Sequence, residues 1–566
     1  MSRHGSRWAV VAAALGALVA CSSSSPRSSA APPSSTAPSS GPHVLLVGTD
    51  KGHAGAYTTI QAAVDAAKPG DWVLVAPGDY HEQYDHTAAP GDRVLGGVYI
   101  TTPALHLRGM DRNSVIVDGT KPGAPACSRA AADQVLGPAG ADGKPVGRNG
   151  IEVWKADGVS IDNLTACNFL VGGAGGGNEI WWNGGDGSGV VGLGAYTGSY
   201  LSATSTYAVG DTAGSYGLFV SNSRGPGRIT HSYASNMADA SFYVGACADC
   251  NAVLDDVHGQ YSALGYSGTN AGGHLIVENS EFDQNKTGFT TNSQNNDDAP
   301  SPQDGACPGG GTGPTGTHSC WVFEHNDVHD NNNANVPGRG TAELAFPGAG
   351  IIIAGGRNDT VVDNRFERNG SWAVAVVPFP DTGTPPPVAH CVGGDPGGVP
   401  TLGLKGCFYA DWGNEIAHNT FVGNGGFGNP TNGDIADISD SHNPGNCWHD
   451  NSDSAGLTSA PTGLEQTNGT CGAAGAGAAL TSPLAVQAIC AAEILAPCPP
   501  KPGMNYPRSS TVTLPALAPQ TTMPDPCAGV PANPWCPAPA RSSVPLGLIG
   551  AATMPVAAAV RRRRPR

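Results

Sequence analysis

Short β-strand patterns, in which apolar and polar residues alternate, recur at a fixed spacing along the middle of the chain. The clearest begin at residues 217, 241, 265 and 288 and again at 350 and 373, so consecutive starts within each run are 23 or 24 residues apart. A fixed period of this length is typical of a solenoid. The alternation has a period of two with no helical period in between, which indicates repeats built of β-strands.

A second apolar segment follows the bend of each repeat, as in Ile276–Phe282, Val322–Val328, Val361–Phe366 and Ile416–Phe421. Three residues after each of these segments stands an asparagine: Asn285, Asn331, Asn369 and Asn424. Stacked coils would place these amides above one another at the strand spacing of about 4.8 Å, where each can bond the next. We therefore expect a structural ladder and not a binding site.

The start of the repeat region predicts a cap. Thr58–Gln61 resembles a capping box, and Ile60, Ala63 and Val64 give the short helix that follows one apolar face. A strand, Trp72–Ala76, comes next. A helix laid across the first coil would cover the exposed end of a solenoid.

The run from Tyr57 to Tyr80, which ends in Pro77-Gly78-Asp79-Tyr80, resembles the opening of pectin-lyase-like β-helix proteins. The resemblance covers roughly residues 44–445. It implies an all-β fold, a single-stranded right-handed parallel β-helix with a short N-terminal capping helix. The superfamily includes lyases, glycosidases, epimerases, esterases and non-enzymatic surface proteins, so the resemblance implies the fold and leaves the activity open.

The predicted organisation has five parts: a lipoprotein signal peptide (1–21), a Ser/Pro-rich tether (22–42), the β-helix (43–445), a disulfide-tied Pro/Ala-rich extension (446–543) and a tail (544–566). Pro/Ser/Ala-rich ends of this kind are too polar and small to bury a core, so the tether is expected to be unfolded.

The N-terminus resembles an export signal. Arg3 and Arg7 precede a short apolar stretch, Trp8–Val19. Leu18-Val19-Ala20-Cys21 then resembles a lipobox, which predicts that Cys21 is lipidated. The alternative is an ordinary signal peptide in which Cys21 falls by chance.

The C-terminal tail contains an uncharged apolar run of 17 residues, Val544–Val560, followed by Arg561–Arg564. This length is near the lower limit for a membrane span, and a basic flank fits retention of the tail on the cytoplasmic side. Pro545 and Pro555 weaken it as a helix. A membrane tail and a non-membrane tail both remain open.

Net charge and cysteine content indicate which class of partner and which cellular compartment to expect. The net charge of −17 excludes nucleic acid as the expected partner, because a phosphate-neutralising basic surface is missing. Fourteen cysteines remain besides Cys21, which favours disulfides in an oxidising compartment. Sequential pairing is predicted for Cys127 with Cys167, Cys247 with Cys250, Cys307 with Cys320, Cys391 with Cys407, Cys447 with Cys471, Cys490 with Cys498 and Cys527 with Cys536. Cys247 and Cys250 could also form a redox pair or half of a zinc site.

The resemblance implies a substrate groove along the outer face of one stacked sheet. Alternation predicts that this face carries Glu152, Trp154, Phe219, Ser221, Tyr243, Gly245, Ser267, Thr269, Thr290, Asn292, Ile352, Ala354, Ala375 and Val377. One carboxylate and no basic group argue against pectate cleavage there. The predicted substrate-binding residues are Trp154, Trp181, Trp182, Phe219, Tyr243, Thr269 and Asn292, since aromatic rings can stack on sugars. Cover of these rings by loops is an equal alternative.

The richest chemistry lies in the insertion that follows Asn292. Asp297, Asp298 and Asp304 are the predicted catalytic carboxylates, dividing acid and base work as in glycosidases. Asp297 and Asp298 could also hold Ca²⁺. The alternative is a solvated loop whose acidic residues satisfy turns. His325, Asp327 and His329 alternate onto one side of a strand and could converge on a metal, although a solvated bend also needs such residues.

These patterns predict an extracytoplasmic, membrane-anchored protein that recognises a polysaccharide. Whether it also cleaves or modifies that polysaccharide stays open, and a lyase or a glycoside hydrolase would be the expected enzyme class. A non-catalytic adhesion or structural module is the alternative.

Overall fold

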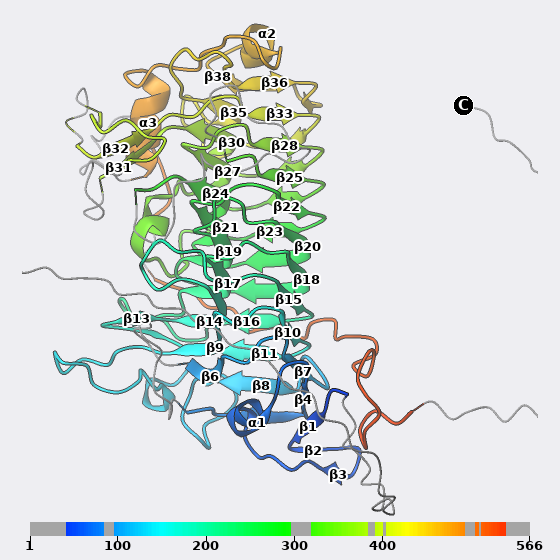
Figure 1. Cartoon of the computed structure of the whole chain (residues 1–566). Coiled ribbons are helices and arrows are strands. Elements are labelled where there is room, and N and C mark those ends of the chain that lie inside the picture. The colour runs from blue at the N-terminus through cyan, green and yellow to red at the C-terminus, as the bar shows by residue number, and fades with distance from the viewer. Residues whose placement is uncertain are drawn as a thin grey trace, which may run out of the picture. The chain divides into compact units, whose positions relative to one another are not determined.

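A computed structural model describes residues 41–83, 96–295, 319–382, 391–399, 403, 405–492, 504–508 and 511–538. The described residues from Pro42 onward form one compact unit. Within it the chain winds through coils stacked along one axis, from the blue N-terminal coils to the yellow C-terminal ones (Figure 1). The fold is a right-handed parallel β-helix, as the sequence predicts, because neighbouring coils pair strand on strand in parallel.

Each typical coil contributes one strand to an eleven-stranded sheet, here called sheet 1. Its strands, in the described residues, are β6 (Gly96–Ile100), β9 (Asn149–Trp154), β14 (Asn178–Asn183), β17 (Tyr216–Ser221), β19 (Ala240–Gly245), β21 (Leu264–Thr269), β24 (Thr287–Asn292), β27 (Ala349–Ala354), β30 (Trp372–Val377), β35 (Gly433–Asp437) and β38 (Ser459–Ala460). They follow one another in chain order across the sheet.

The remaining strands of the coils form sheet 2, which has 21 strands in the described residues. These are β1 (Val44–Val47), β4 (Trp72–Val75), β5 (Gly78–Tyr80), β7 (His106–Gly109), β8 (Val115–Asp118), β10 (Val159–Asp162), β11 (Thr165–Cys167), β15 (Tyr196–Ser199), β16 (Ser202–Thr204), β18 (Gly227–Ser235), β20 (Ala252–Gln260), β22 (Leu275–Glu278), β23 (Glu281–Asp283), β25 (Val322–Glu324), β26 (Asp327–His329), β28 (Thr360–Val362), β29 (Arg365–Glu367), β33 (Glu415–Ala417), β34 (Thr420–Val422), β36 (Cys447–His449) and β37 (Ser452–Asp453).

Three short hairpins and a few helices stand outside the two sheets. The hairpins are β2–β3 (Thr49–Asp50 and His53–Ala54), β12–β13 (Val171–Gly172 and Gly175–Gly176) and β31–β32 (Phe379–Asp381 and Cys407–Tyr409). The helices are α1 (Ile60–Ala66), α2 (Leu464–Asn468), α3 (Pro483–Ala491) and the 3₁₀ turns η1 (Ala131–Asp133) and η3 (Gly340–Leu344).

Helix α1 caps the first coil, as predicted. The Thr59 hydroxyl accepts a hydrogen bond from the Ala62 amide, and Ile60, Ala63 and Val64 turn into the core. Buried Glu82 accepts a further bond from the Ile60 amide at 2.6 Å. The carboxylate therefore satisfies an amide at the helix start that has no partner within the helix.

The core is a stack of apolar side chains that point inward, one level per coil. In sheet 1 this row is Leu218, Phe242, Tyr266, Phe289, Ile351 and Val374, all 1% exposed or less. Tyr266 stacks on Phe289 with ring centroids 4.4 Å apart. Stacking on the next coil is what buries each level, so the repeats support one another.

Amide ladders hold the corners of the C-terminal coils. In the predicted ladder, the side-chain amides of Asn285, Asn331 and Asn369 each donate to the next asparagine at 3.1–3.3 Å, ending at Asn424. A second ladder runs through Asn326, Asn364, Asn419 and Asn451. These buried amides satisfy both each other and backbone carbonyls, so their role is structural.

The solenoid continues beyond residue 445, where the sequence placed its end. Strands β36, β37 and β38 add a further coil, and α2 packs Leu464 into the main core. Helix α3 lies against sheet 1, with Leu484, Ala485 and Ala488 buried. The Pro/Ala-rich composition predicted a loose extension, yet small side chains such as alanine are what allow a helix to lie close to a sheet.

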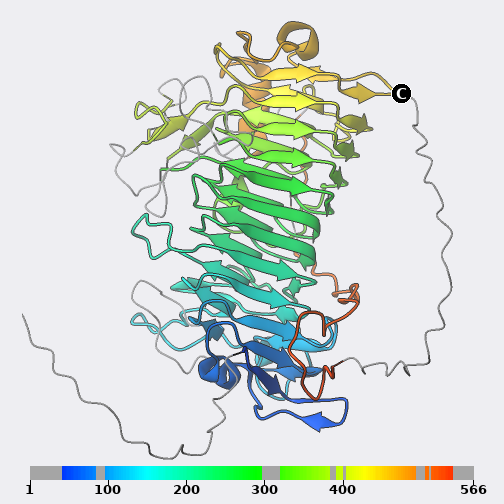
Figure 2. The same ribbon diagram turned by 45° about the vertical axis from the view of Figure 1, so that its right-hand side comes forward.

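Residues 511–538, here called the return segment, run back along the coils (Figure 2). Thr513 bonds Asn335, Thr522 bonds Asn163, and Trp535 donates to the His53 carbonyl at 2.8 Å. Trp535 is fully buried beside Trp72 and Leu74 of the first coils. The last described residues are therefore fixed at the N-terminal end of the stack.

The disulfides of the described residues join neighbouring cysteines in the predicted sequential order. They link Cys127 with Cys167, Cys247 with Cys250, Cys391 with Cys407, Cys447 with Cys471, and Cys527 with Cys536. Cys247 and Cys250 are thus a staple in this state and not half of a zinc site. Cys307 and Cys498 lie outside the described residues.

Candidate functional site

The outer face of sheet 1 carries the side chains that the sequence assigned to it. Cα pairing connects Glu152, Trp181, Phe219, Tyr243, Ser267, Thr290, Ile352 and Ala375 from strand to strand, so these residues form one outward row. A second row, two residues further along each strand, contains Trp154, Ser221, Thr269, Asn292, Ala354 and Val377.

Aromatic rings cluster on strands β14, β17 and β19. Half-buried Trp181 stacks on half-buried Phe219 with centroids 5.0 Å apart, and Tyr216 stacks on the same ring at 4.4 Å. Tyr243 meets Phe219 edge to face at 4.7 Å. Because the rings stack on one another along the helix axis, they offer mainly edges to a ligand, together with the outer face of Trp181.

Three of the predicted binding residues are buried: Trp182, Trp154 and Tyr243, of which Tyr243 is 7% exposed. Trp182 is fully buried and packs beside Tyr196 inside the coil, so it does not belong to the outer face. Alternation requires this, since Trp181 and Trp182 are consecutive and only one can point outward. Trp154 points outward but is only 9% exposed, with the Lys155 ammonium 5.2 Å from its ring centroid.

Glu152, the single carboxylate predicted on this face, is also fully buried. Its two oxygens accept bonds from the Asn149 and Asn183 side chains at 2.8 and 2.9 Å. These amides compensate a buried charge that would otherwise be costly. Glu152 thus supports the sheet and is not presented to a ligand.

Polar groups take over from the aromatic rings at strands β21 and β24. Thr269 donates its hydroxyl to the Asn292 side-chain oxygen at 2.8 Å. The Asn292 side-chain nitrogen is shielded from solvent and has no hydrogen-bond partner among the described residues. A buried donor without an acceptor is rare in folded proteins, so Asn292 offers a bond to an incoming oxygen.

A cavity of about 150 Å³ adjoins these polar groups. Ser267, Thr290 and Asn292 line one part of it, and apolar residues of sheet 1, η3, α3 and the β31–β32 hairpin line most of the rest. Figure 1 shows α3 and this hairpin beside the upper strands of sheet 1. The open part of the face therefore ends at β24, where these elements close over the sheet.

Sequence reasoning missed an acid–base pair at the edge of the aromatic cluster. The Tyr216 hydroxyl donates to an Asp239 carboxylate oxygen at 2.7 Å. Burial raises the pKa of Asp239 to about 7, although the bond from Tyr216 and the charge of Arg339 act in the opposite direction. Burial and the Asp239 charge raise the pKa of Tyr216 well above its usual value. A carboxyl group that titrates near neutrality beside a phenol can transfer protons.

A signal for this pair was present in the repeat. Tyr216 is the first residue of β17 and pairs with Ala240, the first residue of β19, so the residue just before β19 lies close to Tyr216. Asp239 immediately precedes β19. Alternation assigns a side of the sheet only to positions inside a strand, so it does not predict contacts at the strand starts.

Several predicted site residues lie outside the described residues. These are Asp297, Asp298 and Asp304 of the insertion, Cys307, and the lipidation site Cys21. The predicted catalytic carboxylates and the Ca²⁺ site at Asp297 and Asp298 therefore stay predictions.

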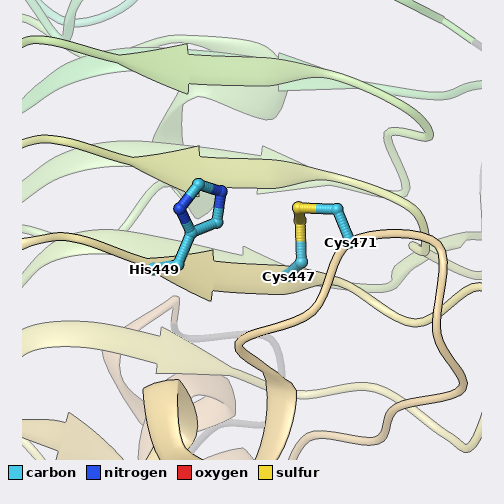
Figure 3. Close-up of side chains that lie close together, drawn as sticks. All are labelled: Cys447, His449 and Cys471. Carbon is cyan, nitrogen blue, oxygen red and sulfur yellow. A yellow bond between two sulfur atoms is a disulfide. The ribbon is translucent and has the colours of Figure 1, made fainter.

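Cys447, Cys471 and His449 form a cluster that resembles a metal site only in its residue types. Figure 3 shows the two sulfur atoms joined in a disulfide beside the imidazole. Metals bind the thiolate form of cysteine, so the intact disulfide leaves His449 as the one ligand of this group.

Among the described residues, no helix is both long and apolar enough to span a membrane. The predicted membrane tail, 544–566, is not among them.

Comparisons with known proteins return structures and no sequences. No family model matches the chain, and no curated protein matches it. The A-module of a mannuronan C-5 epimerase from Azotobacter vinelandii superposes with a TM-score of 0.38 at 14% identity, covering 69% of this chain and 89% of the epimerase module. An alginate lyase from a Paenibacillus species gives 0.31 at 14% identity, covering 59% and 91%.

A mannuronic-acid-specific family 6 polysaccharide lyase from the human gut microbiota gives a TM-score of 0.34 at 13% identity, covering 72% of this chain and 82% of the lyase. Similarities at this level do not indicate which reaction, if any, this chain carries out. The fold assignment rests on the chain's own parallel strand pairing.

Proposed function

We propose that this protein recognises a polysaccharide along the outer face of sheet 1, between β14 and β24. The observation that carries the proposal is the strict register of outward side chains. Successive coils place Trp181, Phe219, Tyr243, Ser267 and Thr290 in one outward row, one per strand at the ladder spacing of about 4.8 Å. Trp181 and Phe219 are half-buried, whereas Tyr243, Ser267 and Thr290 are 5–9% exposed. A polysaccharide is also a linear repeat, so a row of rings followed by hydroxyl groups suits it.

The polar end of the row supplies the hydrogen bonds that a sugar needs. Thr290 lies on this face, and next to the cavity Asn292 holds a donor that no described residue satisfies. A ligand oxygen that accepts from Asn292 would remove the cost of that unpaired amide. The predicted carboxylates Asp297, Asp298 and Asp304 begin five residues after Asn292 and remain candidates for this site.

Catalysis on the bound polysaccharide is a second candidate function, favoured by the Tyr216–Asp239 pair. We infer that Asp239, with its pKa of about 7, exchanges a proton with the Tyr216 phenol. Arg339, whose charge acts on both groups, would stabilise negative charge as it develops. This chemistry serves proton abstraction or leaving-group protonation, the steps that polysaccharide lyases and glycoside hydrolases share.

The same proposal places the protein outside the cytoplasm. The disulfides of the described residues support an oxidising compartment. Anchoring through lipid on Cys21 stays a proposal, and palmitate labelling that persists in Cys21→Ser would contradict it.

A panel of neutral and acidic polysaccharides tests the proposal with two variants. Trp181→Ala and Asn292→Ala should each weaken binding about tenfold, whereas Val190→Ala, at a side chain 57% exposed, should not change it. Such a loss corresponds to about 1.4 kcal/mol. Reducing-end release that disappears in Asp239→Asn would establish catalysis, and binding without turnover would establish an adhesion module. Absence of binding across the panel would refute recognition at this face.

A further inference from the structure

A cluster of one imidazole and two carboxylates lies on the outer face of sheet 2, away from the row on sheet 1. His258 of β20 is the Cα partner of Glu281 on β23, and Asp283 stands two residues further along β23. All three therefore point to the same side of the sheet. One ligand atom from each lies within 4.8 Å of the other two.

His258 stands between the two carboxylates. Its Nε2 atom is 2.6 Å from Asp283 Oδ1, and its Nδ1 atom is 3.8 Å from Glu281 Oε2. Side-chain exposure is 30% for His258, 46% for Glu281 and 8% for Asp283. The group is thus open to solvent on one side and fixed on the other.

Neighbouring side chains hold the outer oxygen of each carboxylate. Gln260 donates to Asp283 Oδ2 at 2.8 Å, and Tyr233 donates in turn to Gln260 at 2.9 Å. His329 Nε2 lies 3.1 Å from Glu281 Oε1, while its Nδ1 is held by Asp330 at 2.9 Å.

The consequence is that Asp283 Oδ1 and Glu281 Oε2 both remain turned toward His258. Oriented ligands backed by an outer layer of hydrogen bonds are the usual construction of protein metal sites.

We propose that His258, Glu281 and Asp283 bind a divalent first-row transition cation, with Zn²⁺ or Mn²⁺ as the fitting ions. Two carboxylates neutralise the charge of the ion, and a neutral imidazole nitrogen favours these metals over Ca²⁺. Three protein ligands leave coordination positions open to water or to an oxygen of a bound molecule. The site is independent of polysaccharide binding on sheet 1.

Calorimetric titration of the full chain with Zn²⁺, repeated with Mn²⁺, tests the proposal. At least one of the two ions should bind at one per chain, and Asp283→Asn and Glu281→Gln should each weaken that binding at least about tenfold. Both variants keep an oxygen that can accept from Gln260 or His329, so the sheet should stay folded. Glu281→Gln is the variant less able to disturb folding, because Glu281 is the most exposed of the three side chains.

His231→Gln serves as the matched control, since His231 pairs with Asp256 on the exposed surface of the same sheet. It should leave binding unchanged. Anomalous diffraction from a crystal grown with the bound ion should place that ion among the three ligands. The proposal is wrong if neither ion binds stoichiometrically, or if both ligand variants bind undiminished. It is also wrong if only His449→Gln lowers binding, which would place the ion at His418, His449 and Asp450.

Discussion

The two halves of the outer face of sheet 1 share one register but differ in what lies on them. From β14 to β24 the row holds aromatic and then polar side chains, and Trp181, Phe219 and Asn292 keep part of their surface exposed. From β27 onward it holds Ile352 and Ala375, which are 3% and 1% exposed under η3 and α3. A single repeat thus makes a partly exposed surface around Trp181, Phe219 and Asn292, and a second apolar core where its outward residues are aliphatic and covered.

Tryptophan-to-alanine substitutions in the two halves should differ most in their effect on the free energy of unfolding. Trp372 is 1% exposed and donates its indole N–H to the Thr431 carbonyl at 2.6 Å. Trp372→Ala should lower the free energy of unfolding by about 3–5 kcal/mol, whereas Trp181→Ala should lower it by about 1–2 kcal/mol. Urea denaturation of both variants measures the difference. Equal losses would mean that the two halves are buried alike.

A charged side chain between α3 and sheet 1 should detach α3 from the sheet. Ala488 is 6% exposed against sheet 1, whereas Val486 of the same helix is 40% exposed. Ala488→Asp buries an unpaired carboxylate and should cost about 2–4 kcal/mol. Limited proteolysis should then cut within Pro483–Ala491 well before the coils. Val486→Asp should resist cleavage as the wild type does, and identical digestion of both variants would contradict the packing of α3.

Asp239 should make the open half sensitive to pH. Its folded pKa of about 7 lies above the usual value of 3.8. The folded state therefore binds more protons between these values, and stability falls as pH rises through that window. Asp239→Asn removes the loss of stability that comes from ionising the buried Asp239 carboxyl group.

At pH 8 the Asp239→Asn variant should be more stable than the wild type by at least about 1 kcal/mol, although proton transfer is lost. Thermal unfolding between pH 4 and pH 8 measures the effect, with exposed Asp142→Asn as the control. If the stability of the wild type and of Asp239→Asn changed with pH in the same way, the pKa of Asp239 would not be raised.

Thr290→Val should produce the smallest structural effect. Thr290 lies on the cavity wall, and valine keeps its shape while removing the hydroxyl. Thr290 is 9% exposed and valine fills nearly the same space, so stability should change by less than about 1 kcal/mol. Polysaccharide affinity should fall severalfold, and an unchanged affinity would exclude Thr290 from the binding face.

The sequence predicted what the repeat itself dictates. The outward set from Phe219 to Val377 and the ladder from Asn285 to Asn424 follow from local alternation and from the need to satisfy stacked amides. Tertiary contacts between distant segments could not be predicted in this way. Helix α3 covers Ile352 from more than 100 residues away, and no local pattern in its Ala-rich sequence names that partner.

The candidate site was predictable only in part for the same reason. Phe219, Tyr243, Thr269 and Asn292 were found because their positions within strands fix their side of the sheet. Asp239 gains its raised pKa from burial beside Tyr216, which depends on how two turns meet. The prediction that Trp182 binds substrate was wrong: it followed the aromatic side chain, whereas alternation turns Trp182 into the core.

The return segment also determines how the molecule would carry a mechanical load. Trp535 is fixed to His53, and Lys51 donates to the Trp535 carbonyl at 2.7 Å, so residues 42 and 538 emerge at the same end of the stack. Tension between these two points would act first on the bonds of the return segment, which can detach one after another. The coils would be bypassed until that segment had peeled away as far as Asn335. A fold with its ends at opposite poles would instead be pulled open coil by coil.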